Sequence, residues 1–140
     1  MKYFSLLLFL VACTNSNQPT EQAEAAIREV LTKQQQAWNE GNLELFMEGY
    51  WKSDSLQFIG SSIRYGWQQT LDNYKKNYAT RELMGQLQFD IWQVVPLGPD
   101  AYLLTGKYTL FRESDQPTGP FTLIFKKKNN TWVIVYDHTS

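Results

Sequence analysis

The feature that most constrains the fold of this chain is a single change of periodicity along it. From Glu21 to Glu40, apolar residues recur at intervals of three and four, which indicates an amphipathic helix that ends before Gly41. From Leu83 to Thr139, apolar, β-branched and aromatic residues form strand-like segments separated by turn residues. A long helix followed by sequential strands predicts an α+β fold, with helices packed on one face of an antiparallel sheet.

Shorter elements fill the stretch between these two regions. Asn42 suits the N-cap of a second helix, whose inner face would carry apolar residues from Leu43 to Tyr50. The elements predicted after it are strands 55–59 and 63–65, a helix over 67–78, and strands 83–96, 101–111, 119–128 and 131–139. Asn129 and Asn130 form a two-residue hairpin signal between the last two strands. The predicted order is therefore ααββαββββ, which closes on a four-strand antiparallel meander.

The N-terminus has the pattern of a bacterial lipoprotein signal peptide. Lys2 gives a positive start, residues 3–10 form an apolar run too short to span a bilayer, and Leu10-Val11-Ala12-Cys13 looks like a lipobox. We therefore expect a signal peptide over 1–12, a lipidated Cys13 with a polar tether over 13–20, and one domain over 21–140. Such a chain is exported and lipid-anchored to the bacterial cell envelope, facing the periplasm or the cell surface.

Composition narrows the classes of function. The formal net charge is −1, and the only basic run, 126–128, precedes the Asn129-Asn130 turn, so we expect no nucleic acid partner. Cys13 is the only cysteine and His138 the only histidine, so we predict no disulfide, no metal and no cofactor. Aromatic residues make up 15% of the chain, which indicates an aromatic core or a cavity lined by aromatic rings.

Several short segments of the chain resemble motifs of one known superfamily. The segment 37–43 resembles its helix–Gly–helix junction, and Tyr50 with Asp54 falls where its members often carry Tyr-Ala-Asp-Asp. The segment 64–66 resembles the strand end that introduces its third helix, and 132–140 resembles its closing strand. On these motifs, the whole predicted domain resembles the nuclear transport factor 2-like superfamily, in particular its SnoaL-like and ketosteroid isomerase-like branch. This fold hosts isomerases, hydrolases, dehydratases and binding modules, so the resemblance predicts architecture rather than chemistry.

The resemblance implies a cone, in which a curved antiparallel sheet wraps around the long N-terminal helix and leaves a pocket open at one end. The outer face of the sheet must still cover its aromatic residues, and we expect a homodimer through that face as the usual solution. Alternation divides the closing strand into the even-numbered residues 132–138 and the odd-numbered residues 133–139, and by similarity the odd-numbered set faces the pocket. The residues that we expect around the pocket are Gln34, Trp38, Phe58, Tyr108, Leu123, Phe125 and Thr139, with Asp137 at its mouth.

Asp137 is the candidate catalytic residue. Steroid isomerisation is excluded, because the family's tyrosine and aspartate base align with Gln34 and Phe58. A carboxylate in an aromatic pocket has its pKa raised by desolvation and can act as a general base. The alternative is a strand-end residue satisfied by backbone amides or by Arg64. Adjacent residues of a strand point to opposite faces, so His138 and Asp137 form no direct pair. The alternative to a catalytic role for His138 is a position on a dimer surface.

Three functions from different classes follow. The first, which we favour, is a membrane-anchored binding module whose pocket holds a small, mostly apolar or aromatic molecule. The second is an enzyme of isomerase, hydrolase or lyase type with Asp137 as general base. The third is a non-catalytic dimerisation or interaction domain whose cavity is filled by its own side chains. Arg64 either binds an anionic group at the rim of the pocket or pairs with Asp54 or Glu82.

Overall fold

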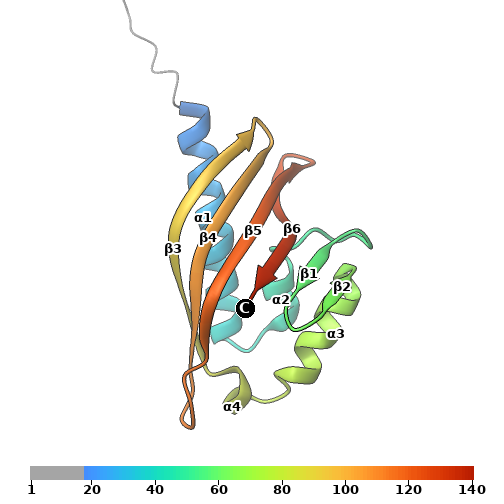
Figure 1. Ribbon diagram of the computed structural model, residues 1–140, viewed down its shortest axis with the longest axis vertical. Coiled ribbons are helices and arrows are strands. Elements are labelled where there is room, and N and C mark those ends of the chain that lie inside the picture. The colour runs from blue at the N-terminus through green and yellow to red at the C-terminus, as the bar shows by residue number, and fades with distance from the viewer. Residues whose placement is uncertain (1–17) are drawn as a thin grey trace, which may run out of the picture.

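The long helix expected from the periodicity of residues 21–40 is present in the computed structural model, which describes residues 18–140 (Figure 1). This helix, α1, spans Gln18–Asn39 and so begins inside the predicted tether, with Pro19 in its first turn, where proline is tolerated. The predicted signal peptide and Cys13 lie outside the described residues. Within 18–140, no helix is both long enough and apolar enough to cross a membrane.

The other elements follow the predicted sequence with one addition. Asn42 caps α2, because its side-chain Oδ1 accepts a hydrogen bond from the Leu45 amide at 2.9 Å. The elements after α1 are α2 (Leu43–Met47), β1 (Gln57–Ile59), β2 (Ile63–Tyr65), α3 (Trp67–Asn77), α4 (Arg81–Met84), β3 (Gln86–Gly98), β4 (Ala101–Phe111), β5 (Thr118–Lys128) and β6 (Thr131–Thr139).

The addition is α4, which replaces the start of the strand predicted over 83–96. The side chain of Thr80 accepts a hydrogen bond from the Leu83 amide and so begins a four-residue helix. Gly85 ends it with φ 62° and ψ −159°, a backbone conformation that is open almost only to glycine. The strand therefore starts at Gln86, and the order is ααββααββββ.

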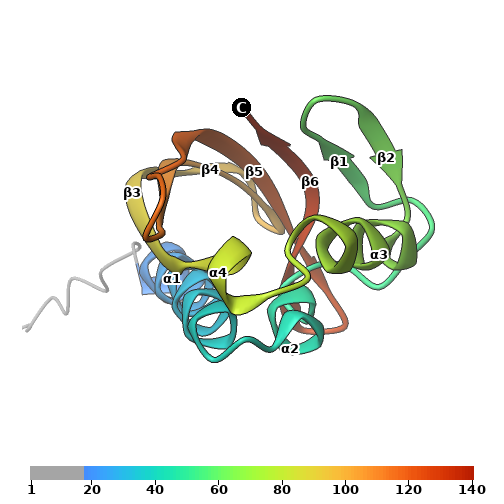
Figure 2. The same cartoon turned by 90° about the horizontal axis from the view of Figure 1, so that it is seen from below.

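One mixed sheet forms the body of the cone. Its strand order is β2-β1-β6-β5-β4-β3, with β1 parallel to β6 and every other pair antiparallel. Seen from below, the long strands curve into a wall, and the helices close its open side (Figure 2). The predicted α+β cone, with a curved sheet around a long first helix, is confirmed.

A β-bulge in β6 changes which residues face the helices. Ile124 pairs with Tyr136 and Phe125 pairs with Ile134, so Val135 is an extra residue without a partner on β5. Before the bulge, Ile134 is buried, whereas after it Asp137 is buried. The predicted alternation without a bulge was therefore wrong for residues 132–135 and right for Asp137 and Thr139, which line the inside of the cone.

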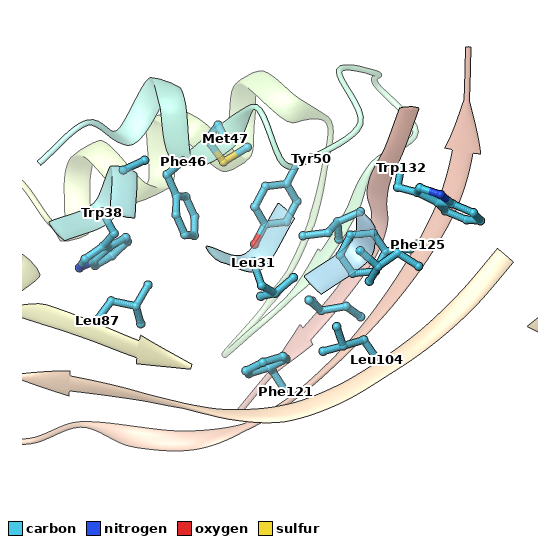
Figure 3. Close-up of a cluster of buried hydrophobic side chains, with 14 of the residues drawn as sticks. Leu31, Trp38, Phe46, Met47, Tyr50, Leu87, Leu104, Phe121, Phe125 and Trp132 are labelled. Atoms are coloured by element: carbon cyan, nitrogen blue, oxygen red, sulfur yellow. The ribbon is translucent and has the colours of Figure 1, made fainter. Parts of the chain in front are cut away.

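The core lies between α1 and the middle of the sheet (Figure 3). Leu31 of α1, Leu104 of β4, Phe125 of β5 and Ile134 of β6 are at most 2% exposed. Burying one such side chain contributes about 1.5–3 kcal/mol. This packed half of the cone holds the sheet against α1 and so fixes the walls of the other half.

Candidate functional site

The other half of the cone encloses a cavity of about 230 Å³. It lies between the C-terminal half of α1, α3 and the inner face of the sheet. The residues that line it include Leu31, Gln34, Trp38, Phe46, Tyr50, Phe58, Ser61, Arg64, Asn73, Tyr74, Tyr78, Phe89, Tyr108, Phe121, Leu123, Asp137 and Thr139. Most of these side chains are apolar or aromatic, and among the described residues Arg64 and Asp137 are the only lining side chains with a formal charge at neutral pH.

The helical wall of the cavity is a connected set of aromatic rings. Trp38 is in edge contact with Phe46 at 5.2 Å and with Tyr78 at 4.8 Å between ring centroids. Tyr74 contacts Phe46 at 5.2 Å and Phe58 at 5.8 Å, which links the helices to β1. Edge-to-face pairs of this kind add about 0.5–1.5 kcal/mol each beyond the area they bury. The wall is therefore rigid as well as apolar.

Asp137, on β6, is the one acidic side chain among the described residues that line the cavity, and it is only 3% exposed. The hydroxyl of Tyr50 donates a hydrogen bond to its Oδ2 at 2.7 Å, and the hydroxyl of Thr139 donates to its Oδ1 at 2.6 Å. Tyr50 is held in place by a bridge between its backbone and Ile134 of β6. Each carboxylate oxygen thus accepts one hydrogen bond and keeps a further lone pair.

The surroundings of Asp137 favour its neutral form. Burial raises the pKa of Asp137 to about 6, although the hydrogen bonds from Thr139 and Tyr50 lower it. Burial also raises the pKa of the Tyr50 hydroxyl well above its usual value, and the charge of Asp137 raises it further. The pKa of Tyr74 is raised in the same way, first by burial and then by Asp137. Both tyrosines therefore remain neutral hydrogen-bond donors at physiological pH.

One row of paired residues crosses the four strands β2, β1, β6 and β5: Arg64, Phe58, Asp137 and Leu123. Phe58 pairs with Arg64 on one side and with Asp137 on the other, and Asp137 pairs with Leu123. Adjacent strands are about 4.8 Å apart, so the backbones of Arg64 and Asp137 are separated by roughly 10 Å. Within the described part of the chain, Arg64 forms no ion pair, so the predicted pairing with Asp54 or Glu82 was wrong.

The structure brings most of the predicted pocket residues together. Those that line the cavity are Gln34, Trp38, Phe58, Tyr108, Leu123, Thr139 and Asp137. Phe125 does not: it lies on the same inner face of β5 as Leu123, but two residues further along the strand, where it is fully buried beside Ile134 in the packed half of the cone. Gln34 is held by a hydrogen bond from its Nε2 to the carbonyl oxygen of Phe46 at 3.0 Å.

The partners of Asp137 differ from those considered on the sequence alone. They are two hydroxyl side chains, rather than the backbone amides or the Arg64 considered in the alternative role of Asp137. The position of Tyr50 at the end of the inner face of the second helix indicated that its side chain points inward. Its contact with Asp137 could not be predicted, because the two residues are 87 positions apart in the sequence. His138 is exposed on the other side of β6. Among residues 18–140, no three His, Cys, Asp or Glu side chains cluster as metal ligands.

The fold and the site together define a class: small α+β cones with a pocket between the helices and the curved sheet. A structure described as an NTF-2 like protein of unknown function from Shewanella oneidensis is 40% identical to this chain, with a TM-score of 0.81. The match covers 84% of this chain and 98% of that one. The chain belongs to this nuclear transport factor 2-like (NTF2-like) family.

More distant structures share the fold. An NTF2-like superfamily protein from Salmonella enterica is 21% identical, with a TM-score of 0.70 over 86% of this chain and 92% of that one. A domain with a cystatin-like fold from Nostoc punctiforme is 17% identical, with a TM-score of 0.71 over 84% of this chain and 75% of that one. No protein-family model matches the sequence, and no curated protein does.

Proposed function

We propose that this protein is a lipoprotein of the bacterial cell envelope whose cone binds a small, mostly apolar or aromatic molecule. The observation that carries this proposal is the cavity of about 230 Å³, walled by rings and bordered by one buried carboxyl group. The third function, a cone filled by its own side chains, is disfavoured because Trp38 and Phe58 line this space without filling it.

The size of the cavity limits the ligand. An apolar cavity of about 150 Å³ is large enough to hold benzene. A cavity of about 230 Å³ therefore accommodates one ring with short substituents, or two fused rings. Ligand pockets in proteins are mostly apolar, with a small number of polar groups that fix orientation, and this cavity has the same composition.

Ligand entry is tested at the turn between β1 and β2. Ser61 is exposed and lines the cavity, whereas its exposed neighbour Ser62 does not. We expect indole to bind the wild-type protein, and Ser61→Trp to weaken that binding at least about tenfold by covering the opening. Ser62→Trp, the matched control, should bind indole like the wild type. Isothermal titration calorimetry measures both; equal affinities for the two variants, or no heat with the wild type, would contradict the proposal.

The anchor is a separate part of the proposal. The cavity meets α1 at Leu31, Gln34 and Trp38, and Leu31 lies about 20 Å along the helix from Gln18 at 1.5 Å per residue. A tether that leads into the start of α1 would therefore leave the cavity facing away from the membrane. In a bacterial host, we expect the chain to incorporate radiolabelled palmitate, and Cys13→Ser to incorporate none. Absence of label in the wild type would remove the anchor.

A second candidate, catalysis by Asp137, is favoured by its pKa of about 6, which suits a general base near neutral pH. Membership of the SnoaL-like and ketosteroid isomerase-like branch is also part of what we propose, and it is compatible with binding as well as with catalysis. In the simplest reaction, Asp137 takes a proton from carbon next to a carbonyl and returns it to carbon. The wild type would then accelerate deuterium exchange into phenylacetone, and Asp137→Asn would lose this while still binding indole. Exchange at the solvent rate removes the candidate.

A further inference from the structure

The carboxyl group of Asp137 has no cationic partner among residues 18–140, although it is almost completely buried. Its two hydrogen-bond donors, Tyr50 and Thr139, are neutral hydroxyl groups. From this arrangement we infer that the cavity takes a molecule with a cationic amine, whose ammonium group pairs with Asp137 and whose apolar body lies against the rings. The inference rests on the proposed binding function and names the chemical class of its ligand.

An unpaired buried carboxylate is unfavourable, because a charge that leaves water is stabilised only by an opposite charge or by several hydrogen bonds. Asp137 accepts one hydrogen bond on each oxygen, which leaves acceptor capacity at the cavity wall. An ammonium group has three donors and a positive charge, and a charge-assisted hydrogen bond is about twice as strong as a neutral one. A cationic ligand thus supplies the positive charge and the additional hydrogen-bond donors that the described residues do not provide for Asp137.

The aromatic walls point to the same class of ligand. Tyr74 lies close enough to Asp137 for the carboxylate to raise its pKa, and Phe58 is the direct cross-strand neighbour of Asp137. The face of an aromatic ring attracts an ammonium group within about 6 Å, and desolvation strengthens the attraction. A carboxylate flanked by rings is therefore a site for a cation rather than for a neutral molecule.

Arg64 is the charged group that opposes this inference. It is half-buried at the β2 end of the row, with Phe58 between it and Asp137, and it is more exposed to solvent than Asp137 is. Its backbone is roughly 10 Å from that of Asp137, so it repels an ammonium group held at Asp137 more weakly than the carboxylate in contact with that group attracts it. An anionic ligand would contact Arg64 but would bring its charge towards the buried carboxylate. The geometry therefore favours the cation.

Three probes with the same ring separate the possibilities: 2-phenylethylamine, 2-phenylethanol and phenylacetate are cationic, neutral and anionic at pH 7.5. Titrated into the purified protein, the amine should bind at least about tenfold more tightly than the alcohol. Its affinity should fall as the pH is lowered from 7.5 to 5, because Asp137 becomes protonated near pH 6. The affinity of the alcohol should not change with pH.

Asp137→Asn keeps the shape of the side chain and removes its charge. In this variant, the preference for the amine and its pH dependence should both disappear, while the alcohol still binds. Asp72→Asn removes an exposed carboxylate on α3, outside the cavity, and is the control for the change in net charge. Tyr50 and Tyr74, which face Asp137 from other elements, carry no charge in this range, whereas Arg64 on β2 stays positive. On β6 itself, the charge of His138 lowers the pKa of Asp137 that burial raises, and Ser140, just after β6, also lines the cavity.

The outcomes distinguish the inference from the function on which it rests. Equal affinities for the amine and the alcohol overturn the cationic ligand and leave the binding function in place. Tighter binding of phenylacetate overturns it in favour of recognition by Arg64. If the amine preference survives Asp137→Asn, the carboxylate is not its source, and the inference fails. If none of the three probes binds, both the inference and the proposed function fail for ligands of this size.

Discussion

Replacing Asp137 with asparagine is expected to raise the free energy of unfolding at pH 7.5 by as much as about 3 kcal/mol, although Asp137 is a candidate site residue. Burial raises the pKa of Asp137 from 3.8 to about 6 in the folded protein. The ionised carboxylate is therefore less stable in the folded state than in the unfolded state, where it is hydrated. Asparagine carries no charge, and its amide oxygen still accepts a hydrogen bond from Tyr50 or Thr139.

The sign of this effect also sets its dependence on pH. Between pH 4 and 6, the folded protein holds the proton of Asp137 and the unfolded protein does not, so this group destabilises the fold as the pH rises. The advantage of Asp137→Asn should be small at pH 4 and reach its full size above pH 6. Urea unfolding of both proteins over this range measures the difference, with Asp72→Asn as control. A variant less stable than the wild type at pH 7.5 would show that the hydrogen bonds to the carboxylate outweigh its desolvation.

A buried charge that weakens the fold has a functional explanation. Natural proteins depart from the most stable choice mainly at sites that serve binding or catalysis. Asp137 lies at the wall of the cavity, and so do its partners Tyr50 and Thr139. If Asp137→Asn is more stable than the wild type and no longer binds the amine, this one variant would show that the carboxylate lowers stability and is needed for binding.

The fold could be predicted from local patterns, because each pattern has a local cause. Gly41, with φ 80°, ends α1, and Asn42 caps α2 as its sequence position indicates. Asn129 and Asn130 both adopt positive φ in the turn between β5 and β6, as a two-residue hairpin requires. Helix α4 was missed because four residues are too short for a periodicity. Its signals were the caps, Thr80 and Gly85.

The site could be predicted less completely, because it depends on register. Placing Asp137 and Thr139 inside the cone needed only the parity of the last few residues of β6. The parity of the residues before them depends on the bulge at Val135, which no residue pattern in the strand reveals. The lipid anchor and a homodimer through the outer sheet face stay predictions. The first falls on residues outside 18–140, and the second requires another chain.

Phe125 was predicted to line the pocket but lies in the core. Of the substitutions considered, its truncation is expected to cause the largest loss of stability. Phe125→Ala should lower the free energy of unfolding by about 3–5 kcal/mol, because the ring is fully buried and its removal leaves a void. Tyr102 and Ile134 flank it on the neighbouring strands and cannot close that space without moving the sheet. A total stability of about 5–15 kcal/mol is usual for a domain, so this loss is a large part of it.

A matched truncation at the cavity wall distinguishes the role of the cavity half of the cone from that of the packed half. Tyr108 is half-buried and borders the cavity, so Tyr108→Ala should cost less, about 1–2 kcal/mol, and should weaken indole binding. Phe125→Ala, studied at a temperature where it is folded, should bind indole with unchanged affinity, since its ring does not reach the ligand. Urea unfolding and calorimetric titration measure the two effects. If Phe125→Ala instead lost less than about 1 kcal/mol and altered indole binding, its ring would border the cavity, and the boundary between core and pocket would lie higher in the cone.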